Sequence, residues 1–484
     1  MFNFLFAAVG KLLWWIVRQI GRLIAWLTVQ AFLHPRTTIT AGTVGGSVAW
    51  LGWQLCLTIA AGALTALSTW KAAHPRTFEQ GVGTWARAWW HRWWIYRRTW
   101  ADSFARCDLT VQARDKTFLP KLKTVRSTPY WDHLFVEMQS GQAASDFIQK
   151  SDHLRGAFKA ERLVIEEVKP RGLDMAFMRR DPLLATVPAT PIPASVADID
   201  WRRIPVGIDE FGRPYTVSLL GGCTCAAGTM GAGKAGLEWN IVRAIAPAIT
   251  AKLVRLVGID PKLKELSQGR KLFAEGDYVG LDTPDLPEAT LALLERLCEE
   301  MAEANNFDGS QGERDFTPRP GRPLTLILID ELAPLLKYWP RRLREKIEEK
   351  LGLLLTQGRA VGFIVVALIQ EPTKDIFSLR DLFARRIALR LPTESHTEAA
   401  LVEHAVDYGA QCHRISETTP GVLFSLQDGA KSTVRARLGY VRDEDIDEVV
   451  AYVENAGKVV ELDAWVRDEL GGIEITADDL GVSA

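Results

Sequence analysis

The longest apolar pattern in this chain is a run that contains no charged residue. Nothing charged lies between Thr37 and Trp70, and within this stretch residues 48–67 read VAWLGWQLCLTIAAGALTAL. An α-helix needs ~20 consecutive apolar residues to cross the hydrocarbon core of a bilayer. Tryptophans near the ends and cations just beyond the run are typical of a membrane span, rather than of a buried helix in a soluble domain. We therefore predict a transmembrane helix over about 47–68.

A second apolar segment, residues 2–33, differs because it carries cations. Lys11, Arg18 and Arg22 are spaced seven and four residues apart, which places them on one helical face. The segment is too long for the core of a secretory signal peptide, and no small-residue cleavage site stands out. We predict an amphipathic membrane helix that either lies along the interface or spans the bilayer.

Tryptophan and arginine are interleaved after the uncharged run, over residues 85–100. The positive-inside rule assigns such a basic cluster to the cytoplasmic face, and the tryptophans would anchor a juxtamembrane helix among the headgroups. We therefore predict a protein of the cell membrane, with everything after Trp70 in the cytoplasm. The alternative is a surface on which unpaired bases stack. The residues are Trp85, Trp89, Trp90, Trp93, Trp94 and Trp100, with Arg87, Arg92, Arg97 and Arg98.

Beyond this membrane anchor of residues 1–100, shorter periodic segments predict folded domains. Residues 101–185 combine an alternating strand at 132–138, a helix at 143–159 and a strand at 162–168, which predicts a small α/β unit. Residues 186–200 are proline-rich at their start (TVPATPIPAS) and predict a linker.

From residue 201 to 440, strand and helix patterns alternate, which favours a parallel sheet flanked by helices. A polar segment rich in glycine and proline, residues 308–323, predicts a surface loop. After residue 440 the chain is crowded with acids, such as DEDIDE at 443–448, and we predict an acidic tail over 441–484. The expected strands cover 253–260, 324–329, 362–369, 385–391 and 422–426, and a helix is expected around 342–356.

The most specific chemical signal is a glycine-rich loop between a predicted strand and a predicted helix. It fits the pattern G-x-x-x-x-G-K, in which successive backbone N–H groups cradle phosphates and the lysine supplies a positive charge. We predict that this loop binds ATP. Its residues are Gly228, Thr229, Met230, Gly231, Ala232, Gly233, Lys234 and Ala235.

The last position of this loop departs from the pattern, because a Ser or Thr hydroxyl there normally contacts Mg²⁺. Neither Ala235 nor Gly236 can supply it. Either Asp330 and water hold the metal, with Thr229 or Thr224 as distant substitutes, or the site binds ATP and turns it over slowly.

A second motif lies about a hundred residues downstream. The apolar run 324–329 (LTLILI) ends in Asp330 and Glu331, so a buried strand would deliver two carboxylates to one edge of the sheet. We expect Asp330 to hold Mg²⁺ and Glu331 to activate the attacking water.

Three further residues are candidates for the reaction. Gln370 ends the strand 362–369 and either senses the γ-phosphate or simply caps the strand. Arg359 and Arg386 are candidates for an arginine finger that reaches a neighbouring subunit, although an ordinary ion pair is the alternative for each.

Charge and cysteine content exclude several other classes. The 484 residues carry a net charge of -1, so any nucleic-acid surface must be local. The six cysteines have no spacing typical of a zinc site or of a disulfide framework.

Long segments of the chain resemble the FtsK/SpoIIIE DNA translocases, and within them the actinobacterial plasmid-transfer branch. The resemblance covers roughly residues 200–440, and the order of the membrane helices and small α/β unit is also similar. The matching segments are GTMGAGKAGLEWN (228–240), VRAIAPAI (242–249), GIDPKLKEL (258–266), LILIDELAPL (326–335), LLLTQGRAVGFIVVALIQEP (353–372), RDLFARRIALRLP (380–392) and PGVLFSLQDG (420–429).

The resemblance implies a RecA-like α/β motor, assembled as a homo-hexamer, that moves double-stranded DNA at the expense of ATP. It implies that Lys234 contacts phosphates, Asp330 holds Mg²⁺, Glu331 activates water and Gln370 acts as the sensor. The branch often reads Gly-Lys-Gly-Ser, so Gly236 lacks the expected hydroxyl. The family's C-terminal winged helix is not visible, which suggests that a separate adaptor protein supplies DNA specificity.

We expect a pump that moves plasmid or integrative-element DNA between cells during conjugation. A chromosome-segregation pump remains an alternative. So does the ATPase of a protein secretion system, although such ATPases usually carry several modules in tandem. The last alternative is a membrane scaffold that binds ATP with little hydrolysis.

Overall fold

The structure is a computed structural model that describes residues 52–113, 116–311, 315–373, 376–427 and 433–469. The predicted helix over residues 2–33 lies outside these ranges. The chain divides into two compact units, which are described separately below. The first comprises Met1–Phe158 and Val164–Ala176, and the second comprises Lys159–Leu163 and Phe177–Ala484.

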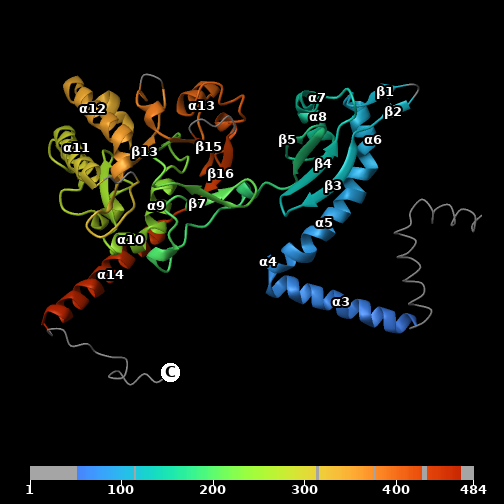
Figure 1. Ribbon diagram of the computed structural model, residues 1–484, viewed down its shortest axis with the longest axis horizontal. Coiled ribbons are helices and arrows are strands. Elements are labelled where there is room, and N and C mark those ends of the chain that lie inside the picture. The colour runs from blue at the N-terminus through green and yellow to red at the C-terminus, as the bar shows by residue number, and fades with distance from the viewer. Residues whose placement is uncertain (1–51, 114–115, 312–314, 374–375, 428–432, 470–484) are drawn as a thin grey trace, which may run out of the picture. The chain divides into compact units, whose positions relative to one another are not determined.

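In the first unit, α3 (Trp53–Ala73) overlaps the predicted span but is displaced toward the C-terminus (Figure 1). By length and composition, it is the one helix among the described residues that could cross a membrane, and none of its most apolar window is buried. It ends at His74, where Pro75 opens the short helix α4 (Pro75–Phe78), because proline cannot continue the preceding helix. Trp70 holds this corner, since its indole N–H donates to the Thr77 hydroxyl at 3.0 Å.

The tryptophan-rich segment forms a nearly continuous helical rod whose two sides differ. The rod comprises η1 (Glu79–Gly83), α5 (Thr84–His91), η2 (Arg92–Tyr96) and α6 (Arg97–Arg106), and η1 and η2 have π-helical geometry. One side is buried against the small domain by Tyr96, Trp100 and Phe104. The buried Asp132 carboxylate fixes this side, because it accepts a hydrogen bond from the Tyr96 hydroxyl at 2.8 Å. The same carboxylate pairs with the His91 ring at 2.9 Å.

A four-stranded sheet forms the body of the small unit, in the order β3-β4-β6-β5. The predicted helix over 143–159 is two helices, α7 (Ala144–Gln149) and α8 (Ser151–Ala157), because the backbone leaves helical geometry at Lys150. The strands are β3 (Lys121–Ser127), β4 (Trp131–Glu137), β5 (Arg162–Lys169) and β6 (Gly172–Met178), with an outlying pair β1 (Val111–Ala113) and β2 (Lys116–Phe118).

The second unit is built on a ten-stranded sheet in the order β11-β10-β12-β13-β9-β14-β15-β16-β7-β8. The predicted parallel pairing holds from β11 to β14, but β14, β15, β16, β7 and β8 pair antiparallel. Short connections such as β7–β8 permit only antiparallel neighbours, because a parallel pair needs a long crossover. The strands are β7 (Ile204–Asp209), β8 (Pro214–Val217), β9 (Thr224–Ala227), β10 (Val254–Asp260), β11 (Tyr278–Gly280), β12 (Leu324–Ile329), β13 (Phe363–Ile369), β14 (Arg385–Ala388), β15 (Val422–Gln427) and β16 (Val434–Leu438).

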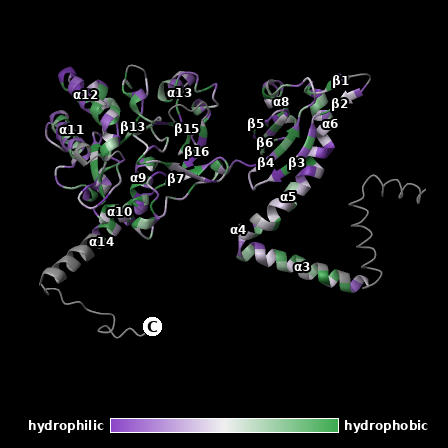
Figure 2. Ribbon diagram, in the orientation of Figure 1, coloured by the Kyte–Doolittle hydropathy of each residue, from purple (hydrophilic) through white to green (hydrophobic). Residues whose placement is uncertain are grey.

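Helices cover both faces of this sheet, so its central strands are buried on two sides. Strand β12 shows this directly, because Ile327 and Ile329 pack toward α11 (Leu286–Gln311) and α12 (Arg341–Gln357), whereas Leu326 and Leu328 belong to the opposite core. That second core is closed by α9 (Ala235–Ala244), α10 (Ala246–Thr250) and α14 (Asp443–Glu469). A strand buried on both faces is apolar at every position, which is why the central strands are almost uniformly hydrophobic (Figure 2).

Two predicted coil segments contain helix. The expected loop 308–323 begins late, since α11 continues through Gln311 and Asp308 pairs with Arg322 at 2.5 Å. Part of the expected acidic tail forms α14, whose Glu448 receives an ion pair from Arg243 at 2.7 Å. The remaining short elements are η3 (Pro182–Leu184), η4 (Val196–Asp198), η5 (Ser267–Leu272), η6 (Pro334–Tyr338), η7 (Gly358–Val361), η8 (Arg380–Leu382), α13 (Glu394–Ala400) and η9 (Cys412–Arg414).

Candidate nucleotide site

The glycine-rich loop connects the end of β9 to the start of α9, as the sequence predicts. Two neighbouring strand ends hold it in place. The Gly228 N–H donates to the Ile369 carbonyl and the Thr229 N–H to the Arg390 carbonyl, each at 3.0 Å. The loop is therefore fixed between β13 and the end of β14, with the N-terminus of α9 opening behind it. Such a helix N-terminus favours negative charge, because its first N–H groups have no intrahelical partner.

Two glycines of the loop have backbone conformations that other residues rarely adopt. Gly231 and Gly233 have φ values of 73° and 88°. At Gly233 a Cβ atom would also lie 2.7 Å from the backbone nitrogen of Gly421, so a larger residue would collide with the start of β15. The pattern therefore requires glycine here for shape as well as for close approach to a ligand.

Lys234 turns back onto its own loop. Its ammonium group donates to the carbonyls of Gly228 at 2.7 Å and Thr229 at 3.2 Å, and only 8% of the residue is exposed. Burial lowers the pKa of Lys234 to about 8, although nearby Glu331 opposes the change. An anion bound in the loop would reverse this effect, because an opposite charge favours the protonated amine.

Asp330 and Glu331 follow β12, which is separated from β9 by the single strand β13. Both carboxylates are almost completely buried. Burial raises the pKa of Asp330 to about 7, and the charges of Asp260 and Glu265 add to the effect. The site thus concentrates negative charge that a cation would stabilise.

Glu331 has three partners in the described chain. Its carboxylate accepts the backbone N–H of Gln370 at 3.1 Å and that of Ala333 at 3.3 Å. It also forms an ion pair with the Lys262 ammonium at 2.8 Å. Lys262 was missed as a site residue, although a charged residue just after a predicted strand end, in Asp260-Pro261-Lys262, was a usable signal.

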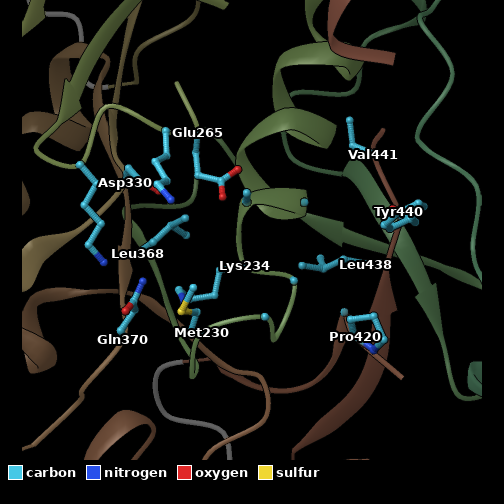
Figure 3. Close-up of a pocket in the computed structure, with 18 residues that line it drawn as sticks. Met230, Lys234, Glu265, Asp330, Leu368, Gln370, Pro420, Leu438, Tyr440 and Val441 are labelled. Atoms are coloured by element: carbon cyan, nitrogen blue, oxygen red, sulfur yellow. The ribbon is translucent and has the colours of Figure 1, made fainter. Parts of the chain in front are cut away.

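Lys234, Asp330 and Lys262 line a cavity of about 610 Å³ (Figure 3), and Glu331 is not part of its wall. Lys234, Asp330, Glu265 and Gln370 lie toward one end of the view, and Pro420, Leu438 and Tyr440 toward the other. One end can therefore receive a charged group, while the other offers apolar and aromatic surface to a flat ring. Seven residues of the site predicted from the sequence line the wall: Met230, Gly231, Gly233, Lys234, Ala235, Asp330 and Gln370. The wall residues that the prediction missed include Lys262, Lys264, Glu265 and the segment from Leu438 to Val441.

The two arginine candidates lie outside the cavity wall. Arg386 is buried in β14 and pairs with Asp381 of the same chain at 3.0 Å. Arg359 is exposed in η7, just before β13 begins, and so lies at the opposite edge of the sheet from Gln370.

Neither proposed substitute for the missing hydroxyl is placed at the metal position. The Thr229 hydroxyl donates to the Arg390 carbonyl at 3.2 Å, and Thr224 is buried at the start of β9. Among the described residues no three Asp, Glu, His or Cys side chains converge as a complete metal site. A divalent ion here would therefore take much of its coordination from the nucleotide and water, with Asp330 as the carboxylate that fits it.

Comparison with known proteins gives a family. A DNA translocase FtsK from Corynebacterium efficiens is 26% identical over 318 residues, which cover 60% of this chain and 31% of that protein. The DNA translocase SftA from Bacillus subtilis is 24% identical over 263 residues, or 52% of this chain and 26% of that protein. The chain is similar to the DNA translocases of the FtsK/SpoIIIE family. The matches span about a third or less of the length of these relatives.

Two other comparisons complete the finding. No protein-family profile matches the chain. A solved structure of the conjugation coupling protein TcpA of pCW3, in its monomer form with ATPγS, is 17% identical with a TM-score of 0.45, and the match covers 73% of this chain and 98% of TcpA.

Proposed function

We propose that this chain is a membrane-anchored ATPase that moves double-stranded DNA. The observation that carries the proposal is the order β12-β13-β9, which brings Asp330 and Glu331, Gln370 and the phosphate loop to one edge of the sheet. Each group has a role in ATP hydrolysis: Lys234 would contact the phosphates, Glu331 would accept the proton of the attacking water, and Gln370 would orient that water. Mg²⁺, held by Asp330, would offset the phosphate charge when bound.

Similarity to the FtsK/SpoIIIE family supports DNA as the cargo, because the matched relatives are named DNA translocases. Helix α3 supports the membrane anchor, with the ATPase unit in the cytoplasm where ATP is available. We further propose a homo-hexamer, in which each site lies at an interface between subunits. The cargo we favour is plasmid or integrative-element DNA in transit between cells, loaded through a separate DNA-binding adaptor.

The test is ATP hydrolysis by the full chain in detergent, with and without linear duplex DNA. We expect duplex DNA to stimulate turnover severalfold more than single strands do. The Lys234→Ala variant should lose at least about 100-fold of this rate, because it removes the positive charge opposite the transferred phosphate. If turnover does not depend on DNA while Lys234→Ala is inactive, the chain is an ATPase and the translocase proposal is rejected.

A second candidate is an ATP-binding membrane scaffold with little hydrolysis. It is favoured by the missing hydroxyl at Ala235 and by Lys262, which forms an ion pair with the Glu331 carboxylate. ATP binding with no turnover at any DNA concentration would support this candidate over the motor.

A further inference from the structure

The phosphate loop lacks an oxygen ligand that its chemistry calls for. A hydroxyl directly after the lysine normally coordinates the metal of the bound nucleotide. Ala235 and Gly236 lack one, and the Thr229 hydroxyl is used by the Arg390 carbonyl. If the site uses a metal, the ligand that replaces this hydroxyl is either water or another oxygen of the fold.

Glu238 lies on the same helix, one turn beyond this position. It follows Ala235 by three residues in α9, and side chains three residues apart lie on the same side of a helix. Glu238 is completely buried. Within the described chain, neither of its carboxyl oxygens has a hydrogen-bond partner. Buried polar atoms are nearly always paired, so two unpartnered oxygens in one carboxyl group need an explanation.

The surroundings of Glu238 indicate a cation. Burial raises the pKa of Glu238 well above its usual range, and the charges of Asp330, Asp260 and Glu265 raise it further, so these carboxylates act on one another. Asp260 differs from Glu238, because it already accepts the backbone N–H groups of Lys264 and Leu266. Glu238 differs from Asp260 in that neither of its oxygens has a partner, and it lies on the helix that starts at the phosphate loop.

We propose that Glu238 provides the protein oxygen for the nucleotide-bound divalent metal, in place of the missing loop hydroxyl. Its carboxylate would act with Asp330, either directly on the ion or through a water molecule. The inference rests on the proposed nucleotide site. A glutamate in this role explains why its own oxygens have no partner and why the loop can end in alanine.

The alternative is a protonated carboxyl that serves only as packing. The two explanations differ in what the Glu238→Gln variant does, because glutamine keeps the size of the side chain but is a neutral and weaker ligand. A packing residue should tolerate this change, whereas a metal ligand should not. The loop offers a matched rescue, since Ala235→Ser restores a hydroxyl at the position where the motif expects one.

The experiment measures Mn²⁺ binding by electron paramagnetic resonance, using the full chain in detergent saturated with a non-hydrolysable ATP analogue. Binding of the analogue in EDTA is measured in parallel. We expect Glu238→Gln to weaken Mn²⁺ binding about tenfold or more while analogue binding in EDTA stays unchanged. The double variant Ala235→Ser with Glu238→Gln should recover much of the lost Mn²⁺ affinity.

Three results would overturn the proposal. The first is unchanged Mn²⁺ affinity in Glu238→Gln. The second is an equal loss of analogue binding in EDTA, which would mean that the change disturbs the fold of the loop. The third is a loss of Mn²⁺ affinity alone that the added Ala235→Ser substitution does not restore, because Glu238 would then not replace the loop hydroxyl. Failure of the unchanged protein to bind the analogue at all would instead reject the proposed nucleotide site.

Discussion

Lys262 holds Glu331 in a buried ion pair, and this gives a prediction for a single residue. The ammonium pairs with an almost fully buried carboxylate at 2.8 Å. Removing one partner of a buried pair leaves an uncompensated charge, so the Glu331 carboxylate should leave its position in Lys262→Met. We expect ATP turnover at saturating ATP to fall about tenfold, because a general base acts only from the correct position.

The conservative variant Lys262→Arg is the control, because it keeps the positive charge. It should retain most of the ATP turnover of the unchanged protein. Unchanged turnover in Lys262→Met would contradict the prediction, since it would show that Glu331 does not depend on this ion pair.

Asp330 gives a prediction about stability. Its pKa is raised to about 7 in the folded chain, from an ordinary value of 3.8. Between these two values the folded state holds a proton that the unfolded state has lost. The contribution of Asp330 therefore lowers the free energy of unfolding progressively as the pH rises from about 4 to 7. Without added nucleotide, Asp330→Asn should raise the free energy of unfolding by about 1–3 kcal/mol above pH 7. Near pH 4 the substitution should leave it unchanged.

Thermal unfolding without nucleotide, at one scan rate and at several pH values, measures this difference. The melting temperature of Asp330→Asn should separate from that of the unchanged protein only as the pH rises. A constant difference across the pH range would mean that packing, rather than charge, sets the effect.

At the scale of elements, the sequence predicts best what is locally determined. Strands β12 and β13 are buried at every position and almost uniformly apolar because helices cover both faces, and the phosphate loop is bounded by a strand and a helix. The ion pair of Lys262 with Glu331 joins residues 69 apart, and no local pattern encodes it. The antiparallel half of the sheet and helix α14 were missed for a related reason, since pairing partners and packing faces are set by the tertiary fold.

The outer side of α5 and η2 gives a prediction for one element. Trp85, Trp89, Trp90 and Trp94 are all at least half exposed, and Trp90 stacks on Trp94 at 5.2 Å. Exposed Arg92, Arg97 and Arg98 accompany them. We expect this surface to sit among anionic headgroups, because indole rings favour the interface and arginine is attracted to anionic lipid. In nanodiscs, brominated anionic lipid should quench tryptophan fluorescence more than brominated neutral lipid does.

Replacing both Trp89 and Trp94 with Ser should remove most of this difference between lipids. Arg92→Gln with Arg98→Gln is the matched variant, since it keeps every indole and removes two charges. It should retain quenching by neutral lipid and lose the preference for anionic lipid. Equal quenching by both lipids in the unchanged protein would show that the arginines do not contact headgroups.

At the scale of the whole molecule, the cavity lacks one component of a complete ATPase. Its cationic side chains are Lys234, Lys262 and Lys264, and no arginine of the described chain lines it. P-loop NTPases stabilise the transition state with an arginine that can be supplied in trans. Arg386 is a poor donor because it is buried and paired within its own chain, whereas Arg359 is exposed. We therefore expect Arg359 to complete the site of the next subunit.

Mixing two inactive variants tests this assembly. A Lys234→Ala subunit would keep its arginine, and an Arg359→Ala subunit would keep its phosphate loop, so about a quarter of the interfaces in a randomly mixed ring would be intact. Equal mixing should restore DNA-stimulated hydrolysis that neither variant shows alone. The same mixture with Arg386→Ala should gain no activity beyond that of the Arg386→Ala variant alone, because the ion pair of Arg386 with Asp381 lies within one subunit. Recovery with Arg386→Ala but not with Arg359→Ala would reverse the assignment, and recovery with neither would place the catalytic arginine elsewhere.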